Sequence, residues 1–134
     1  MARTYTVFIS HSWDYVDDLK SLRRLLENRG YFNVKFSEAS PDEPINSENS
    51  AYIKHRLKEK ISSSDIVLGI AGVYSSYSDW MEWELDTAMG ENIPIVGIVP
   101  RGRERVSSVV CSRAQEVVRW NTESIVEAIR KWAK

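Results

Sequence analysis

Cysteine and histidine are scarce in this sequence, and long apolar runs are missing. The chain has 134 residues with one cysteine, Cys111, and two histidines, His11 and His55. A single cysteine cannot form an internal disulfide, and two widely separated histidines are too few for a metal site, so we expect neither. No segment approaches the roughly 20 apolar residues of a membrane span, and the N-terminal apolar run is too short for a signal peptide. We therefore expect a soluble, cytoplasmic protein.

An excess of charge of either sign is also absent. Lys and Arg total 18 against 19 Asp and Glu, and no long basic run appears. This balance gives no electrostatic reason to expect nucleic acid or a membrane surface as a partner. The length fits one domain with a single well-buried core, so we expect residues 1–134 to form one domain.

The glycine motifs of common nucleotide sites are absent as well. The sequence contains neither G-x-G-x-x-G nor G-x-x-x-x-G-K-[ST], which excludes the dinucleotide fingerprint and the kinase-type phosphate loop. A flavin-phosphate loop would need glycine amides where Ser10-His11-Ser12 stands. A phospho-receiver would need an aspartate where Ala71-Gly72 stands, and no G-x-S-x-G elbow is present for a serine hydrolase.

Short apolar runs alternate with amphipathic segments along the whole chain. The apolar runs predict strands at 5–9, 31–36, 65–71, 93–99 and 116–120. Apolar residues at helical spacing predict helices at 14–29, 50–61, 78–90 and 121–132. Ser50 is a predicted cap, and Gly30 and Gly90 are predicted helix stops. Regular alternation predicts an α/β, flavodoxin-like domain of three layers, with a five-stranded parallel sheet of order 2-1-3-4-5 and helices on both faces.

The segment from Ser75 to Gly90 places one carboxylate among apolar side chains. Ser78 or Asp79 can cap a helix that begins here. At about 100° per residue, Glu84 falls within the apolar arc of this helix. The arc consists of Trp80, Met81, Leu85, Ala88 and Met89. A Glu in such an arc must be paired, be protonated or open into a cleft, so its pKa can shift. We therefore single out Glu84 as the candidate functional residue; the alternative is a slightly rotated helix with this Glu in a salt bridge at the rim.

Two polar loops are expected to meet beside this helix. In a sheet of this order, ligands bind beyond the carboxyl ends of the strands, between the first and third strands. The loop after the first strand is Ser10-His11-Ser12, and the loop after the third is Tyr74–Asp79. Helical side chains tilt toward the N-terminus of their helix, so Glu84 is expected to lean toward that rim. An alternative for Ser10 and Ser12 is that they only cap the first helix.

Three segments together resemble a TIR-like domain. They are Phe8-Ile9-Ser10-His11-Ser12, the long loop that starts at Ser37, and Ser78-Asp79-Trp80-Met81-Glu82-Trp83-Glu84, in which a tryptophan is followed four residues later by a glutamate. The match extends in order over nearly the whole chain. Within the wider family, the sequence is most similar to the bacterial and archaeal TIR-like proteins, some of which act in the Thoeris anti-phage system.

This resemblance implies an enzyme that cleaves the nicotinamide–ribose bond of NAD, with Glu84 as the catalytic residue. NAD would be a substrate, and no recycled cofactor is implied. The product would be ADP-ribose or a cyclised isomer, and the resemblance implies that it could serve as a signal to a downstream effector protein in immunity. The substrate-binding candidates are Ser10, His11, Ser12, Tyr74, Ser78 and Trp80. Trp13 is a further candidate for stacking on a base, and the loop at 37–50 corresponds to the one that governs self-association in TIR proteins.

Two other functions are compatible with the same residues. Many TIR domains only assemble with one another, and in such a non-catalytic interaction module Glu84 would be an interface or structural residue. A nucleoside deoxyribosyltransferase shares the sheet order and also uses a glutamate, as its nucleophile. Release of nicotinamide from NAD separates the first function from both alternatives.

Overall fold

A computed structural model describes residues 3–37, 47–72, 75, 78–100, 102 and 106–134. Tyr74, the side chain of Trp13 and most of the loop at 37–50 lie outside the described part of the chain, together with Arg101, Arg103 and Arg105.

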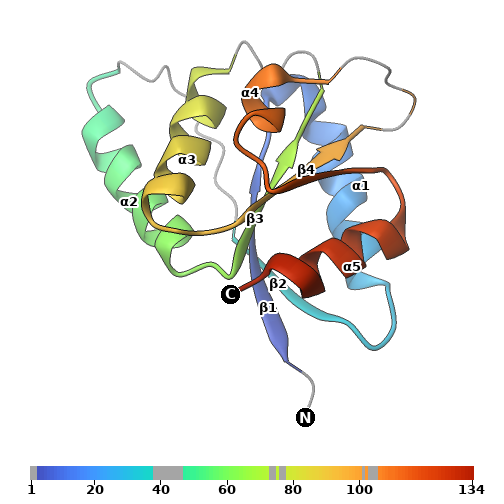
Figure 1. Cartoon of the computed structure of the whole chain (residues 1–134). Coiled ribbons are helices and arrows are strands. Elements are labelled where there is room, and N and C mark those ends of the chain that lie inside the picture. The colour runs from blue at the N-terminus through green and yellow to red at the C-terminus, as the bar shows by residue number, and fades with distance from the viewer. Residues whose placement is uncertain (1–2, 38–46, 73–74, 76–77, 101, 103–105) are drawn as a thin grey trace.

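Five parallel strands form one sheet in the order β2-β1-β3-β4-β5, as the sequence predicts (Figure 1). The strands are β1 (Thr4–Ser10), β2 (Asn33–Ser37), β3 (Ile66–Ile70), β4 (Ile95–Val99) and β5 (Glu116–Arg119). The helices are η1 (Trp13–Tyr15), α1 (Val16–Glu27), α2 (Ser50–Ser62), α3 (Asp79–Gly90), α4 (Ser108–Cys111) and α5 (Thr122–Trp132). Because all strands run the same way, the loops that follow β1, β3 and β4 emerge at one edge of the sheet.

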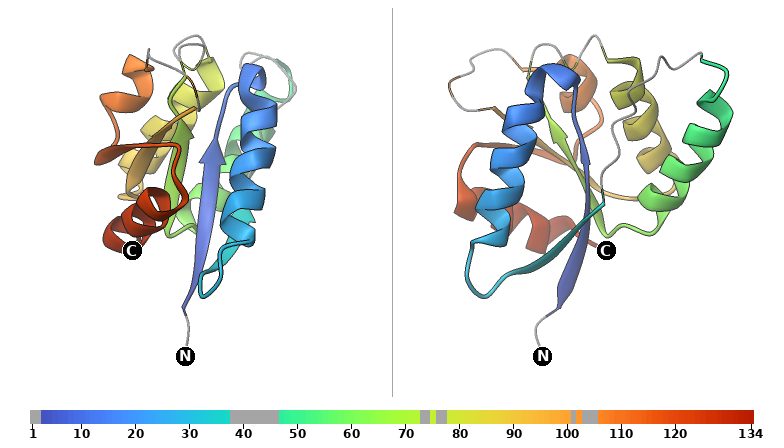
Figure 2. Two further views of the ribbon diagram at one scale, coloured as in Figure 1. Left: turned by 90° about the vertical axis from the view of Figure 1, so that its right-hand side faces the viewer. Right: turned by 180° about the vertical axis from the view of Figure 1, so that it is seen from behind.

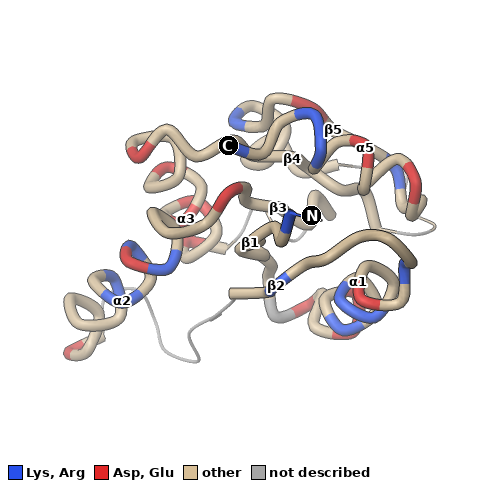
Figure 3. The backbone as a smooth tube through the Cα atoms, turned by 90° about the horizontal axis from the view of Figure 1, so that it is seen from below, with Lys and Arg blue, Asp and Glu red and all other residues tan. Residues whose placement is uncertain are grey.

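The helices cover both faces of the sheet and create two separate hydrophobic cores (Figure 2). One core packs α1 and α5 against one face, and the other packs α2, α3 and α4 against the opposite face. Every residue of β3 is buried, as expected for a central strand between two helical layers. Basic and acidic residues both occur along α1, α2 and α5, whereas α3 carries acidic residues and no Lys or Arg (Figure 3).

The helix stop predicted at Gly30 is wrong, whereas the one predicted at Gly90 is confirmed. Helix α1 ends at Glu27, three residues before Gly30, and Gly90 is the last residue of α3. The left-handed backbone conformation occurs at Tyr31 (φ 58°) and Asn92 (φ 59°) instead. Asn adopts this conformation at modest cost because its short polar side chain can hydrogen-bond locally, and so it replaces glycine after α3. The left-handed residue therefore lies one residue after Gly30 in the first case and two residues after Gly90 in the second.

The cap predicted at Ser50 is displaced by one residue. Ser50 is the first residue of α2, and Asn49 precedes it without a side-chain capping hydrogen bond. The apolar face predicted for this helix is confirmed, because Leu57 and Ile61 are buried against α3 and the sheet. Ser50 therefore locates the start of this helix, but the N-cap position is occupied by Asn49.

Gly72, just beyond the end of β3, packs against the ring of the buried Tyr15. A Cβ atom at position 72 would lie 2.0 Å from Tyr15 Cζ and 2.1 Å from its hydroxyl oxygen. We expect Gly72→Ala to lower the free energy of unfolding by about 1–3 kcal/mol or more, because the aromatic ring must move. In the Tyr15→Leu background, Gly72→Ala should lower the free energy of unfolding much less. A double-mutant cycle measured by urea unfolding should therefore show strong coupling between the two positions.

Gly30→Ala is the matched control for this prediction. No atom lies within 4 Å of a Cβ at position 30, and its backbone is not left-handed. Its effect should be neutral or slightly stabilising. Equal costs for the two alanine variants would show that the Tyr15 contact does not restrict position 72.

Candidate active site

Helix α3 positions the candidate carboxylate. Ser78 is its N-cap, and the Ser78 hydroxyl accepts a hydrogen bond from the Met81 amide at 3.2 Å. The face turned toward the sheet consists of Met81, Glu84, Leu85 and Ala88. Ser78, a candidate substrate contact, therefore has a structural role at the start of this helix.

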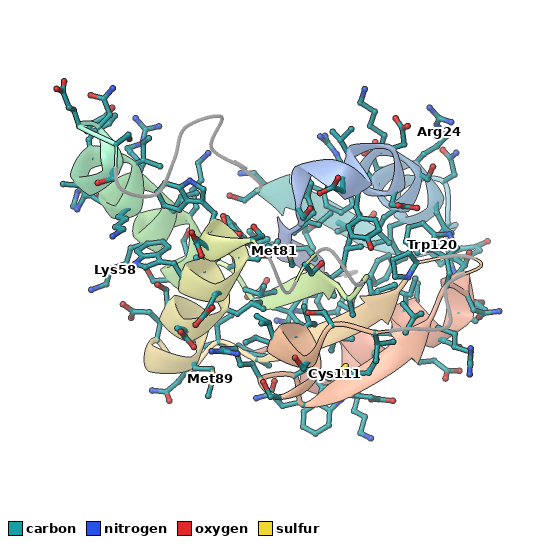
Figure 4. All side chains as sticks on the ribbon, turned by 90° about the horizontal axis from the view of Figure 1, so that it is seen from above. Arg24, Lys58, Met81, Met89, Cys111 and Trp120 are labelled. Atoms are coloured by element: carbon teal, nitrogen blue, oxygen red, sulfur yellow. The ribbon has the colours of Figure 1, made fainter. Side chains whose placement is uncertain are left out.

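The buried arc of α3 is narrower than the sequence predicts. Met89 is 51% exposed, so its predicted place in the core is wrong, and Trp80 is only half-buried. At about 100° per residue, Met89 lies about 40° beyond Leu85 around the helix axis, and Trp80 lies about 40° beyond Glu84 on the other side. Both residues are therefore outside the buried face. Figure 4 shows Met81 on the inner side of α3 and Met89 near its far end. Glu84 lies at one border of the buried face, yet it is only 1% exposed.

The Glu84 carboxyl group meets the end of β1. The Ser10 hydroxyl donates to Glu84 Oε1 at 2.6 Å, and Ser10 itself is completely buried. Ser10 is the last residue of β1, and it points to the same face of the sheet as Phe8. Glu84 therefore lies below the loop that follows β1, as topology and helical periodicity predict. Glu84 is buried rather than at the rim, and it forms no salt bridge with any described residue.

Burial raises the pKa of Glu84 from 4.5 to about 8, and the hydrogen bond from Ser10 partly opposes this shift. Burial raises a carboxyl pKa because the charged form loses its hydration. The carboxyl group is therefore mostly protonated at neutral pH in the free protein. A carboxyl group with so large a shift, at the ligand-binding edge of a parallel sheet, is typical of a functional site.

His11 and Ser12 follow Ser10 and are also buried. Burial lowers the pKa of His11 to about 4, although a hydrogen bond with the Ile9 backbone opposes the shift, so this imidazole is neutral at physiological pH. The Ser12 hydroxyl accepts from the Asp14 amide at 3.1 Å and caps η1. The alternative interpretation as a cap is therefore correct for Ser12, whereas the Ser10 hydroxyl binds Glu84.

Two buried serines that the sequence analysis did not select hold the neighbouring loops. The Ser75 hydroxyl donates to the Ile70 carbonyl at the end of β3. The Ser107 amide donates to the Ala71 carbonyl at 2.9 Å and ties the start of α4 to the same strand end. Both side chains are completely buried. No sequence pattern distinguishes them from the other serines of polar loops.

Trp80 is the last of the candidate substrate contacts among the described residues. It packs against the core beneath α3, and its ring makes an edge-on contact with Trp83 at 5.9 Å between centroids. A half-buried indole can serve both as part of the core and as a stacking surface. Of the predicted site residues, the structure brings Ser10 and Glu84 into direct contact and places His11, Ser12, Ser78 and Trp80 on the adjoining elements.

Two open depressions lie away from this pair. One, of about 360 Å³, is lined by mostly charged and polar residues of β5 and α5. The other, of about 450 Å³, includes Pro94 and Gln115, which precede β4 and β5, so it lies at the opposite edge of the sheet from Ser10. Neither contains a buried titratable group, and the same holds for the open depressions lined by charged residues of α1 and of α3, so Glu84 stays the candidate site.

The described residues hold no group of three or more His, Cys, Asp or Glu side chains that could bind a metal ion. His55 lies on the exposed side of α2, with its Nε2 atom 3.0 Å from Glu59 Oε1. Within the described ranges, no helix is long and apolar enough to cross a membrane.

The sheet is five-stranded and parallel, and the glutamate of the Trp-x-x-x-Glu helix reaches the end of β1. Residues 8–105 match the family described as "Thoeris protein ThsB, TIR-like domain". The chain therefore belongs to this family of the Thoeris anti-phage defence system. No curated protein matches the chain.

Two solved structures share the fold. The first is a 2-deoxyribosyltransferase from Bacillus psychrosaccharolyticus, with 16% identity, coverage of 90% of this chain and 89% of that chain, and a TM-score of 0.63. The second is a flavoprotein in complex with FMN from Lactobacillus acidophilus NCFM, with 14% identity, coverage of 98% and 100%, and a TM-score of 0.50. At such low identity these similarities concern the fold alone.

Proposed function

We propose that this protein cleaves NAD at the bond between nicotinamide and ribose, with Glu84 as the catalytic residue. The observation that carries the proposal is the Glu84 carboxyl group, buried at the carboxyl edge of the sheet and hydrogen-bonded to Ser10 at 2.6 Å. Membership of a Thoeris TIR-like family supports the proposal, because it sets this carboxyl group in a defence-system domain.

The proposed reaction needs few protein groups. When the C1′–N bond breaks, nicotinamide takes the bonding electron pair and leaves as a neutral ring, so no general acid is required. The ribose is left with oxocarbenium character, and a carboxylate held away from bulk water stabilises that positive charge. Attack by water then yields ADP-ribose and releases one proton, whereas attack by a group within the same molecule yields a cyclic isomer.

Binding of NAD should convert Glu84 to its charged form. The nicotinamide ring of NAD carries a positive charge, and an opposite charge within a few ångströms favours a carboxylate. The pKa of about 8 in the free protein should therefore fall when substrate binds. In this proposal the free protein keeps the acid neutral, and the substrate itself generates the catalytic anion.

The remaining candidates fit roles in holding the substrate. We propose that His11, Ser12, Ser78, Trp80 and Tyr74 surround the nicotinamide riboside or the adenine. The neutral His11 is suited to hydrogen bonding rather than to ion pairing with the phosphates. We further propose that the product signals to a partner effector of the defence system, and that the region 37–50 mediates self-association.

The pH dependence of catalysis follows from the ionisation of Glu84. We expect kcat/KM for nicotinamide release to rise with pH and to level off above an apparent pKa near 8, because this parameter reports the free enzyme. The rise of kcat with pH should occur at lower pH than the rise of kcat/KM, because bound NAD lowers the pKa of the Glu84 carboxyl group. Initial rates measured on both sides of pH 8 test this prediction. A kcat/KM that is independent of pH through this region would contradict it.

The competing functions give different results with the same purified protein. A non-catalytic interaction module releases no nicotinamide at any protein concentration. A deoxyribosyltransferase releases bases from deoxynucleosides and leaves NAD intact. An NAD-cleaving enzyme releases nicotinamide and ignores deoxynucleosides, which is the result we expect.

A further inference from the structure

We propose that Ser10 is a positioning residue, which holds the Glu84 carboxyl group in one orientation beneath the substrate and acts on the reaction through it. This inference rests on the proposed function of Glu84. The sequence alone suggested that Ser10 contacts the ribose or a phosphate. The structure points to a different use of its hydroxyl group.

The single hydroxyl proton of Ser10 is already used. It is donated to Glu84 Oε1 at 2.6 Å, a length typical of a strong hydrogen bond to a carboxyl oxygen. Ser10 is completely buried, and Glu84 is 1% exposed. A serine hydroxyl has one donor, so while it binds Glu84 it cannot donate to a substrate oxygen. Within the described part of the chain, Ser10 is the only side chain hydrogen-bonded to this carboxyl group.

Among the described residues, the neighbours of Ser10 on the same face of the sheet offer no other polar side chain to Glu84. Ser10 pairs with Gly69 of β3, and Gly69 pairs with Gly97 of β4. A Cβ atom at Gly69 would lie 3.2 Å from Val110 Cγ1 and 3.7 Å from Leu85 Cδ2. The two glycines thus let apolar side chains of α3 and α4 pack directly onto the strands. On that side the carboxyl group therefore lies over apolar side chains, and among the described residues a single hydroxyl group orients it.

Charged side chains on the adjoining elements are directed elsewhere. Arg113, which follows α4, binds Asp86 and Glu82 on the exposed side of α3. Lys58 of α2 pairs with Glu91 beyond the end of α3. The nearby His11 and Cys111 are both uncharged at neutral pH, because burial lowers the pKa of the imidazole and raises that of the thiol. Among the described groups, burial is the larger influence on the pKa of Glu84, and the Ser10 hydrogen bond acts in the opposite direction.

Ser10→Ala tests the proposal without relying on turnover. The pKa of the Glu84 carboxyl group is measured by carbon-detected NMR titration of carboxyl-labelled protein, with its signal assigned by its loss in Glu84→Gln. We expect Ser10→Ala to raise this pKa by about one unit, since a hydrogen bond that favours the charged form has been removed. The rising limb of kcat/KM should move to higher pH by the same amount, so that activity at neutral pH falls about tenfold.

Two further variants make the result specific. Ser10→Thr keeps a hydroxyl group and should restore both the pKa and the rate, provided that circular dichroism shows a folded protein. Ser64→Ala removes another buried serine, whose hydroxyl donates to the Lys60 carbonyl at 2.7 Å before β3 begins, and it should change neither. If Ser10→Ala raises KM while the Glu84 titration is unchanged, Ser10 contacts the substrate and the positioning role is wrong. An unchanged titration with unchanged kinetics overturns it equally.

The outcomes also separate this inference from the proposed function. If the wild-type protein releases no nicotinamide, NAD cleavage fails as a function, yet the titration still reports whether Ser10 controls the carboxyl group. If nicotinamide release depends on Glu84 but the titration is the same in Ser10→Ala, only the positioning role fails.

Discussion

Glu84→Gln is expected to reduce the rate of nicotinamide release from NAD by about 10²–10³-fold or more, a loss typical of removing a group that stabilises transition-state charge. Glutamine has nearly the same shape as glutamate, and its amide oxygen can still accept from the Ser10 hydroxyl, which lies 2.6 Å from Glu84 Oε1. What the variant lacks is the negative charge that forms when NAD binds. Binding of NAD should be weakened far less than turnover, because most of the dinucleotide lies away from this carboxyl group.

Glu82→Gln provides the matched control for this loss. Glu82 lies on the same helix, two residues earlier, but its side chain is 52% exposed and 3.7 Å from Arg113. The same chemical change at this position should leave turnover close to that of the wild-type protein. The comparison requires nicotinamide release under saturating NAD and a separate binding titration for each variant. Equal turnover in Glu84→Gln and wild-type protein would show that another residue carries the reaction.

Glu84→Gln is also expected to make the folded protein more stable at neutral and alkaline pH. The folded-state pKa of about 8 lies above the ordinary value of 4.5, so between these values the folded protein binds a proton that the unfolded chain has lost. Stability therefore falls as pH rises through this window, and the loss is complete above pH 8. By neutral pH the cost reaches about 3 kcal/mol, a large part of the stability of a small domain.

Urea unfolding at a series of pH values measures this effect. The free energy of unfolding of the wild-type protein should decline between pH 4.5 and pH 8 relative to that of Glu84→Gln, and the two curves should separate steadily across the window. Glu82→Gln should follow the wild-type curve, because that side chain is largely solvated. Parallel curves for Glu84→Gln and wild-type protein would mean that the Glu84 carboxyl group is not held protonated in the fold. A stabilised but inactive variant would show that the folded protein gives up stability to retain this acid.

The fold and the position of Glu84 could both be predicted from sequence because each rests on a repeated signal. The apolar run that follows Asp65, in the strand predicted at 65–71, identifies a strand buried on both faces, and it became β3 at the centre of the sheet. The helical period places Glu84 among residues that turned out to be buried. Errors of one or two residues do not move the centre of a long apolar pattern, and so these predictions were robust.

Features set by one tertiary contact could not be predicted. Met89 has the right period for the core but lies just outside the covered face of α3, and nothing in the sequence gives the width of that face. The Ser10 hydroxyl was equally suited to capping a helix, to contacting a substrate or to binding Glu84. Only the approach of α3 to β1 decides between these uses.

The most direct test of the account is the release of nicotinamide from NAD by the purified wild-type chain, followed over a wide range of protein concentrations beside Glu84→Gln. The account predicts one nicotinamide for each NAD consumed by the wild-type protein, and only background release by the variant. Binding of NAD without release at every concentration, or equal release by both proteins, would contradict it.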